Sequence, residues 1–367
     1  MRVEYDQSAA YTRPIEGELA IVRSQSPPPG RPPTGSIRHR FGLWLAYAIA
    51  LLLAGSALAD VRHFRFQPAN GDPGLAQHTV SALLQDRTGY IWVGTQGGLH
   101  RYDGRAFRVF QQASADTSSL PDNFVTALAD GAPGKLWVGT NSAYVAELDE
   151  TTGKFRRLLP ADLDHPGEPG KRVLALYFEP GQGLWVASKG GIDLLDPDTG
   201  QRRSVLRAPS PAALRDPYGF ARDDSGALWV TLPAGLYRID PVTLATRRIQ
   251  APAAVADIVR DQRGRLWVSA ADGLYRLDPV AATLQRASLA VDASEDVNHL
   301  MRMVVDTHDR LWISTVRNGL IRFDPDRGQS IELHANAAQE GNIPEELVNA
   351  LLVDRSGLLW IGTMTDG

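Results

Sequence analysis

The stretch RLWVSAADGLYRLDP, residues 265–279, decides the fold because the chain repeats it. Residues 227–241 read ALWVTLPAGLYRIDP, and residues 310–325 read RLWISTVRNGLIRFDP. Each copy holds a β-prone run around a tryptophan, a turn, and a second run that ends in Asp-Pro. Recurrence of one supersecondary unit at a regular interval is the signature of a repeat architecture.

Seven tryptophans mark seven copies of this unit. They are Trp92, Trp137, Trp185, Trp229, Trp267, Trp312 and Trp360, which stand 38 to 48 residues apart. A period in this range is typical of β-propeller blades. An acidic residue stands six residues before each tryptophan, or seven before it in the second copy. We expect the tryptophans to pack between neighbouring sheets, and the acids and glycines to fix the turn that precedes them.

Each copy divides into four short β-strands. In the first copy these are TVSALLQD (79–86), YIWVGT (90–95), LHRYD (99–103) and AFRVFQ (106–111). The repeat region shows no sustained helical period. Four strands in seven copies predict an all-β fold, a seven-bladed β-propeller over residues 60–367.

The two ends of the repeat region predict how the ring closes. Residues 63–67, HFRFQ, resemble the fourth strand of the first blade but precede its first strand, so they are expected to complete the last blade. The last copy stops at Gly367, where its third strand should begin. The sequence therefore predicts an incomplete last blade with unpaired strand edges and a fragment of a longer protein.

The first 59 residues indicate export. Residues 1–37 are polar and Pro-rich, and we expect them to be disordered. Residues 38–59 combine basic residues, an uncharged apolar run and a final Ala-Leu-Ala, which is typical of a signal peptide cleaved before Asp60. An uncleaved anchor helix is the alternative. Either reading predicts export of residues 60–367 across the membrane.

Composition excludes several classes of function. The formal net charge is −4 and no basic tract is present, so we expect no nucleic-acid partner. The chain has no cysteine, which excludes disulfides, thiolate catalysis and Cys-ligated zinc. Its eight histidines occur singly and without metal-ligand spacing, and no nucleotide-binding or nucleophile motif occurs. We therefore predict no catalytic residues, no metal and no cofactor, and a chain that is not itself an enzyme.

Loop geometry predicts where a ligand would bind. In a propeller the loops that lead into the first strand and the turns after the second strand share one face, around the axis. The polar residues at these places are His78, Gln96, Asn123, Asn141, Lys171, Lys189, Arg215, Asn298, Arg317 and Asn318. Such a ring of donors suits a carbohydrate or an anion. The alternative is that each of them is a solvated loop residue.

The repeat resembles that of the two-component regulator propeller family. LPDNFVTALAD (120–130) and DRTGYIWVGTQGGLHRYDG (86–104) carry the resemblance most clearly, and it extends over about residues 62–367. The resemblance implies a periplasmic sensor domain, followed by a β-sandwich, a transmembrane helix and a histidine kinase or diguanylate cyclase. It also implies an unidentified small ligand of oligosaccharide type. We further predict signalling through the association of two propellers as a homodimer.

Two other functions remain open at this point. One is a secreted enzyme of the streptogramin-lyase or sialidase type, which would need a His/Glu arrangement at the mouth of the ring. The other is a protein-interaction scaffold with no small ligand. Membrane attachment would come from a downstream helix or from an uncleaved N-terminal anchor.

Overall fold

The computed structural model describes residues 2–4, 65–67, 74–160, 171–207, 219–232, 235–289, 300–316, 319–334, 343 and 347–364. These residues belong to one compact unit. Their regular structure consists of β-strands, with no α-helix. Accordingly, no helix that could span a bilayer is found in them. The predicted signal or anchor segment, 38–59, and residues 5–37 of the Pro-rich tail lie outside the described residues.

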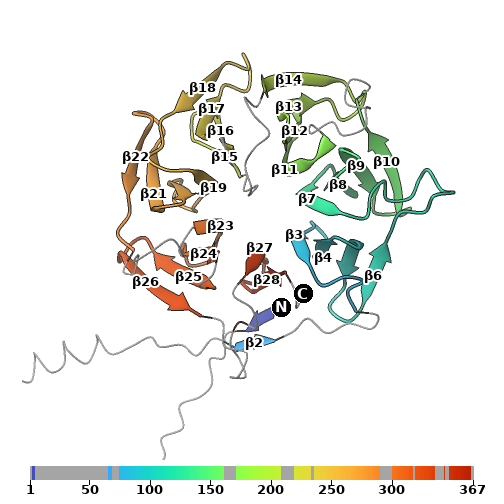
Figure 1. Cartoon of the computed structure of the whole chain (residues 1–367), viewed down its shortest axis with the longest axis horizontal. Helices are drawn as coiled ribbons and strands as arrows, with labels where there is room; N and C mark the ends of the chain where they lie inside the picture. The colour runs from blue at the N-terminus through green and yellow to red at the C-terminus, as the bar shows by residue number, and fades with distance from the viewer. Residues whose placement is uncertain are drawn as a thin grey trace, which may run out of the picture. The chain divides into compact units, whose positions relative to one another are not determined.

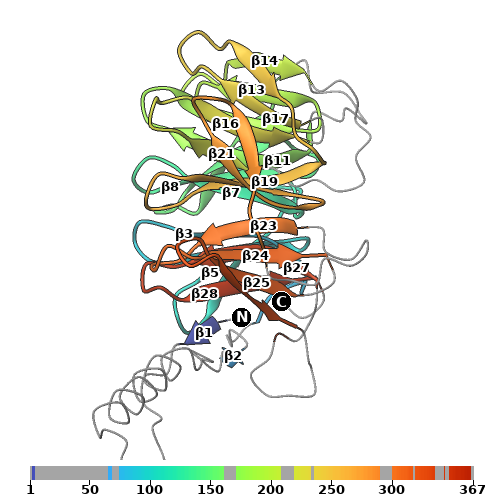
Figure 2. The ribbon, with the colours of Figure 1, turned by 90° about the vertical axis from the view of Figure 1, so that its left-hand side faces the viewer.

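The chain folds as an all-β propeller. Six four-stranded antiparallel sheets, here called blades 1 to 6, follow one another in chain order around a central axis (Figure 1). Each of these blades is made of four consecutive strands, and its first strand lies nearest the axis. Figure 2 shows the ring from its side, where β23 of blade 6 runs beside β19 of blade 5.

The strands of the first three blades have the following bounds. Blade 1 contains β3 (Val80–Gln85), β4 (Ile91–Thr95), β5 (Gly98–Tyr102) and β6 (Phe107–Phe110). Blade 2 contains β7 (Val125–Asp130), β8 (Lys135–Thr140), β9 (Val145–Asp149) and β10 (Lys154–Leu158). Blade 3 contains β11 (Val173–Glu179), β12 (Gly183–Ser188), β13 (Gly191–Leu195) and β14 (Arg202–Arg207).

The next three blades repeat the pattern. Blade 4 contains β15 (Phe220–Arg222), β16 (Leu228–Leu232), β17 (Gly235–Ile239) and β18 (Thr246–Ile249). Blade 5 contains β19 (Val255–Arg260), β20 (Leu266–Ala270), β21 (Gly273–Asp278) and β22 (Thr283–Arg286). Blade 6 contains β23 (Leu300–Val305), β24 (Leu311–Thr315), β25 (Leu320–Asp324) and β26 (Gln329–Leu333).

A further four-stranded sheet, here called the closing sheet, joins the two ends of the chain. Its strand order is β2 (Arg65–Gln67), β1 (Arg2–Glu4), β28 (Leu359–Thr363) and β27 (Val348–Val353). β2 takes the outermost place, where the sequence analysis puts the closing strand. The predicted gap at the third strand is filled by β1, three residues of the expected disordered tail. Backbone groups of β2 and β28 that a gap would leave unpaired thereby gain partners.

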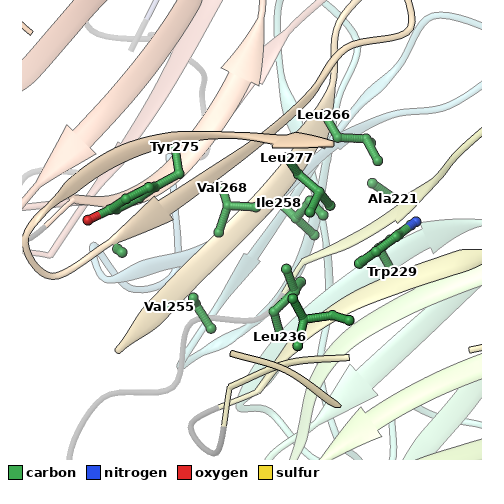
Figure 3. Close-up of a cluster of buried hydrophobic side chains, with 11 residues drawn as sticks. Ala221, Trp229, Leu236, Val255, Ile258, Leu266, Val268, Tyr275 and Leu277 are labelled. Atoms are coloured by element: carbon green, nitrogen blue, oxygen red, sulfur yellow. The ribbon is translucent and has the colours of Figure 1, made fainter. Parts of the chain in front are cut away.

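The tryptophans hold the ring together by packing across blade boundaries. Trp229 of blade 4 lies in one apolar cluster with Val255, Ile258 and Leu266 of blade 5 (Figure 3). Trp360 of the closing sheet likewise packs with Val80 of blade 1, so the ring is sealed by the same kind of contact. All seven repeat tryptophans are buried, with at most 6% of each side chain exposed. Such burial contributes on the order of 2–3 kcal/mol for each side chain.

The acid before each tryptophan organises the turn in five of the seven copies. In blade 1, Asp86 Oδ1 accepts from the backbone N–H groups of Thr88, Gly89 and Tyr90 at 2.9–3.1 Å. Its Oδ2 accepts from Trp92 Nε1 at 2.7 Å. Gly89 has φ 102°, a left-handed conformation that glycine adopts without steric cost. One carboxylate therefore links the turn to the interblade core.

Candidate functional site

The inner strands of the ring carry β-bulges at the end where they begin. The strand register shifts after the first residue of β3, β7, β11, β19, β23 and β27. The residues that the shifts leave out of the ladder are Ser81, Thr126, Leu174, Ala256, Met301 with Arg302, and Asn349. A bulge re-aims a side chain away from the regular pleat, and bulges occur often beside functional sites.

Five of these six bulges line one cavity on the axis. The cavity has a volume of about 460 Å³, and Ser81, Thr126, Leu174, Arg302 and Asn349 are among its lining residues. Because residues at the start of inner strands and at the end of second strands line it together, it opens on the predicted ligand face. A volume of this size suits a small molecule.

A second cavity of about 230 Å³ lies next to the first along the axis. It shares the five bulge residues Ser81, Thr126, Leu174, Arg302 and Asn349 with the first cavity. Further residues along the inner strands, including Tyr177, Gly219 and Asp257, complete its wall. The two cavities together form one axial site, called here the axial cavity.

Three charged side chains line the axial cavity within the described residues: Arg172, Arg302 and Asp257. Asp257 is buried, and its carboxylate accepts from the backbone N–H of Ile258 at 2.8 Å and of Met303 at 2.9 Å. Burial raises the pKa of Asp257, while Arg302 and the two backbone donors act in the opposite direction. Asp257 is therefore a fixed polar group in the wall.

Hydroxyl groups from neighbouring strands hold the bulges in place. Thr231 Oγ1 donates to the carbonyl of Ala256 at 3.0 Å, across the boundary between blades 4 and 5. Ser269 Oγ donates to the carbonyl of Met301 at 2.8 Å, across the next boundary. Within blade 6, Ser314 Oγ accepts from the backbone N–H of Arg302 at 3.0 Å. The backbone that presents Arg302 to the axis is thus fixed on both sides.

Of the ten predicted ligand residues, six fall in the described part of the chain. Gln96 lines the axial cavity, and His78 is exposed. Asn123 Oδ1 accepts from the backbone N–H of Gln112 at 2.7 Å, which gives it a role in its own loop. Asn141 and Lys189 donate their backbone N–H groups to the carbonyls of Phe124 and Arg172, the residues that immediately precede the inner strands β7 and β11.

Lys171, the sixth of these residues, is partly buried and stands just before β11. Apart from Gln96, none of the six is among the described residues that line the axial cavity. The other four predicted ligand residues lie outside the described residues: Arg215, Asn298, Arg317 and Asn318.

Sequence reasoning missed the bulge residues, although a signal for them exists. In blades 1, 2 and 3 and in the closing sheet, the bulged residue is the middle one of a Val-x-Ala triplet: Ser81, Thr126, Leu174 and Asn349. The alternation of a strand suggests that this residue points into a sheet-to-sheet interface. The bulge brings these residues to the wall of the cavity, although Leu174 also packs in the core shared with blade 4. The sequence analysis expected a regular strand.

The described lining offers no arrangement that is typical of catalysis. It contains neither a histidine nor a glutamate, the pair that the lyase alternative requires. Within the described residues, no group of three or more His, Asp or Glu side chains could hold a metal ion. Polar, apolar and charged groups that converge on a concave site are instead typical of ligand binding.

Comparison with known proteins identifies the repeat. Residues 74–97, 119–142 and 342–365 match the two component regulator propeller family. A segment of 68 residues is 35% identical to histidine kinase P4 of Formosa agariphila, and it covers 18% of this chain and 5% of that protein. The chain therefore carries repeats of the two component regulator propeller family.

Solved structures share the fold. The extracellular domain of a putative hybrid two component system from B. thetaiotaomicron superposes with a TM-score of 0.67 and 21% identity, over 82% of this chain and 41% of that one. Virginiamycin B lyase from Staphylococcus aureus superposes with a TM-score of 0.61 and 13% identity, over 79% of this chain and 93% of the lyase. The chain thus spans less than half of the extracellular domain to which it is similar.

Proposed function

We propose that residues 60–367 are a non-catalytic, periplasmic ligand-sensing domain of a bacterial two-component or cyclic-di-GMP signalling protein. The axial cavity is the observation that supports this proposal, since bulges on five inner strands open onto one concave site of about 460 Å³. The matched repeats and the likeness to an extracellular domain of a hybrid two component system support the signalling context.

Ligand binding at this place would act on the whole ring. The first cavity is lined by residues of blades 1, 2, 3 and 6 and of the closing sheet, so a bound molecule contacts five inner strands at once. We propose that the closing sheet completes a ring of seven blades. A ligand that bridges blades favours one arrangement of the ring, and this bias would reach an output domain through the association of two propellers.

Thermal unfolding of the full chain tests ligand sensing. We expect a library of mono- and oligosaccharides and sugar acids to contain molecules that raise the unfolding temperature. Ser81→Leu, which fills the cavity from β3, should abolish the shift. Val242→Thr, on an outer turn where the side chain is 83% exposed, is the matched control and should retain it. A shift that persists in Ser81→Leu would place the ligand elsewhere and contradict the proposal.

Export is tested separately. Alkaline phosphatase fused after Gly367 folds to an active enzyme only outside the cytoplasm, so colonies that express the fusion should show activity. Deletion of residues 38–59 should abolish that activity, because the proposed signal is then lost. Equal activity with and without these residues would contradict the proposed role of the segment.

A further inference from the structure

We propose that blades 4 and 5 carry a surface that contacts an anionic phospholipid bilayer. This surface, called here the rim patch, consists of Val242 and Val280 at two hairpin tips and of Arg247, Arg248 and Arg286 on the outer strands that follow these tips. None of these five residues is among the described residues that line the axial cavity. The rim patch is therefore separate from the site of the proposed ligand sensing.

The turn between the third and fourth strands is built alike in five blades. In blade 4, Asp240 Oδ1 accepts from the backbone N–H groups of Val242 and Thr243 at 2.9 and 2.8 Å. In blade 5, Asp278 Oδ1 accepts in the same way from the residues two and three places further on. The aspartates that form the same pair of bonds in blades 2, 3 and 6 are Asp149, Asp196 and Asp324. The backbone of the turn is thus fixed by its aspartate, whichever side chain stands at the tip.

The tip of the turn, two residues after the aspartate, differs between the blades. Blades 2, 3 and 6 have the polar residues Thr151, Asp198 and Asp326 there. Blades 4 and 5 have Val242 and Val280, which are 83% and 94% exposed, more than any other large apolar residue that the structure describes. Because the turn forms with threonine or aspartate at its tip, the fold does not require these valines. Exposed apolar side chains at the same place in two neighbouring blades indicate a contact surface.

The inner side of each tip is attached to the core. Two residues after the valine, Leu244 and Ala282 have φ 60° and 56°, where the turns of blades 2, 3 and 6 have Gly153, Gly200 and Gly328. Both side chains pack against interblade apolar clusters, which offsets the steric cost of a left-handed conformation. The turns are thereby held in place while their tips stay in solvent, so a contact at the tips loses little conformational entropy.

Positive charge accompanies the two apolar tips. The outer hairpin of blade 4, residues 235–249, contains three arginines and one aspartate, and that of blade 5, residues 273–286, contains two arginines and one aspartate, so their formal charges are +2 and +1. The corresponding hairpins of blades 2 and 3 are neutral, and that of blade 6 has a charge of −1. Residues 98–110 of blade 1 also carry +2, but their turn contains Arg105 in place of an apolar tip. Apolar tips and net positive charge thus coincide only in blades 4 and 5 of the six, although the whole chain has a formal net charge of −4.

An anionic bilayer fits this combination of groups. Apolar side chains enter the headgroup region, while guanidinium groups bind lipid phosphates and are attracted by the negative surface. The outer strands β18 and β22 belong to neighbouring blades and lie side by side at the rim, so one flat surface can reach both tips (Figure 1). A second copy of the chain fits less well, because a two-fold contact would place the arginines of the two copies against each other.

A fluorophore placed at one tip of the full chain tests the proposal. The chain has no cysteine, so Val280→Cys creates a single site for labelling with NBD, whose emission depends on its surroundings. Vesicles of phosphatidylethanolamine and phosphatidylglycerol provide the anionic surface, and vesicles of phosphatidylcholine provide a neutral one. We expect the emission to increase and shift to the blue with the anionic vesicles only, because the tip then leaves water for the headgroup region. Asp326→Cys, labelled at the equivalent tip of blade 6, is the matched control and should not respond.

Removal of two arginines tests the contribution of charge. Arg247→Gln with Arg248→Gln, made in the labelled Val280→Cys chain, should raise the lipid concentration at half-maximal response by about 10- to 30-fold. Lys154→Gln with Arg157→Gln removes two exposed charges from β10 of blade 2 and should change it much less. An increase of the ionic strength from about 0.01 M to about 1 M should weaken the response of the unchanged patch, because it shortens the Debye length from about 30 Å to about 3 Å.

Several results would overturn the lipid assignment. The two labels could respond equally, which would mean that another part of the chain brings it to the vesicles. The label at position 280 could respond equally to neutral vesicles, could fail to respond at all, or could respond unchanged without the two arginines. Sedimentation could also show a dimer that Val242→Ser with Val280→Ser converts to a monomer, in which case the rim patch is a contact between copies. Ligand sensing is judged separately by the Ser81→Leu thermal experiment.

Discussion

Blades 2 and 3 differ from the rest of the ring in how they hold their tryptophans. In blades 1, 4, 5 and 6 and in the closing sheet, tryptophan Nε1 donates to the preceding aspartate at 2.7–3.1 Å. In blade 2 the acid stands one residue too early, and in blade 3 it is Glu179. The Nε1 atoms of Trp137 and Trp185 have no hydrogen-bond partner among the described residues.

The third strands differ in the same two blades. An arginine lies opposite the tryptophan in blades 1, 4, 5 and 6, namely Arg101, Arg238, Arg276 and Arg322. In blades 2 and 3 these places hold Glu147 and Leu194. The boundary between these blades has its own polar contact instead, because Tyr144 donates its hydroxyl to Asp193 at 2.9 Å. Burial of the tryptophan is thus common to all blades, while the polar arrangement around it can be exchanged.

Removal of a turn aspartate should have the largest effect. Asp223→Ala deprives the backbone N–H groups of Ser225 and Ala227 and the indole of Trp229 of their acceptor. We expect a loss of about 3–4 kcal/mol in the free energy of unfolding, because several buried donors lose one shared partner. Urea denaturation measures it. Asp130→Ala in blade 2 breaks an exposed ion pair with Arg87 and should cost less than about 1 kcal/mol.

The Tyr144–Asp193 contact should make stability depend on pH. Burial raises the pKa of Asp193 to about 6, although the Tyr144 hydroxyl, Arg207 and the Ser204 hydroxyl oppose the change. The folded chain then holds this proton more tightly than the unfolded chain, whose carboxyl has its ordinary pKa near 4. Stability should therefore fall by about 2–3 kcal/mol as the pH rises from about 4 to about 6.

Comparison of Asp193→Asn with the unchanged chain isolates this contribution. The variant cannot ionise at that position, so the difference in urea midpoint between the two chains should change between pH 4 and 6 and be constant above. Burial also lowers the pKa of His100, so protonation of His100 at low pH changes the stability of both chains in the opposite direction. Taking the difference between the two chains removes this contribution. A constant difference across the range would contradict the assigned pKa of Asp193.

Replacement of single tryptophans should reveal a smaller difference in the free energy of unfolding between the two kinds of blade. Trp229→Phe and Trp185→Phe remove similar apolar area, but the first also leaves Asp223 Oδ2 without its donor. The second removes an indole N–H that has no partner among the described residues. We expect Trp229→Phe to cost about 1–2 kcal/mol more than Trp185→Phe in urea unfolding. Equal costs would mean that the Asp–Trp hydrogen bond contributes little.

The sequence predicts the ring because its determinants are local and repeated. Tryptophan spacing, alternation and turn glycines give the all-β propeller. Asp130 and Glu179, which depart from the six-residue Asp pattern, mark the two blades whose Trp–Asp hydrogen bond is missing. The identity of the third strand in the closing sheet was not predictable, because pairing of β1 with β28 joins residues from opposite ends of the chain. No local pattern in three residues encodes such a pairing.

The site was less predictable than the fold. Polar loop residues were the expected ligands, yet Asn123 is used within its own loop and Gln96 alone of the six described candidates lines the cavity. Several of the residues that line it are instead on inner strands, where bulges turn them toward the axis. A bulge depends on register between two strands, and a sequence pattern of period two does not show it.

The bulges also separate the chemistry of the axis from the pairing and packing of the blades, two properties that usually constrain each other in a protein. A bulged residue such as Asn349 lies outside the strand ladder, whereas its neighbours Val348 and Ala350 are buried and paired in it. Substitution of Asn349 therefore changes the chemistry of the axis without removing a ladder hydrogen bond. Other bulged residues also join blades, because Ser81 Oγ donates to the carbonyl of Val125 and Leu174 packs against blade 4. Rings of this construction can diverge in what they bind while their cores stay the same, one axial residue at a time.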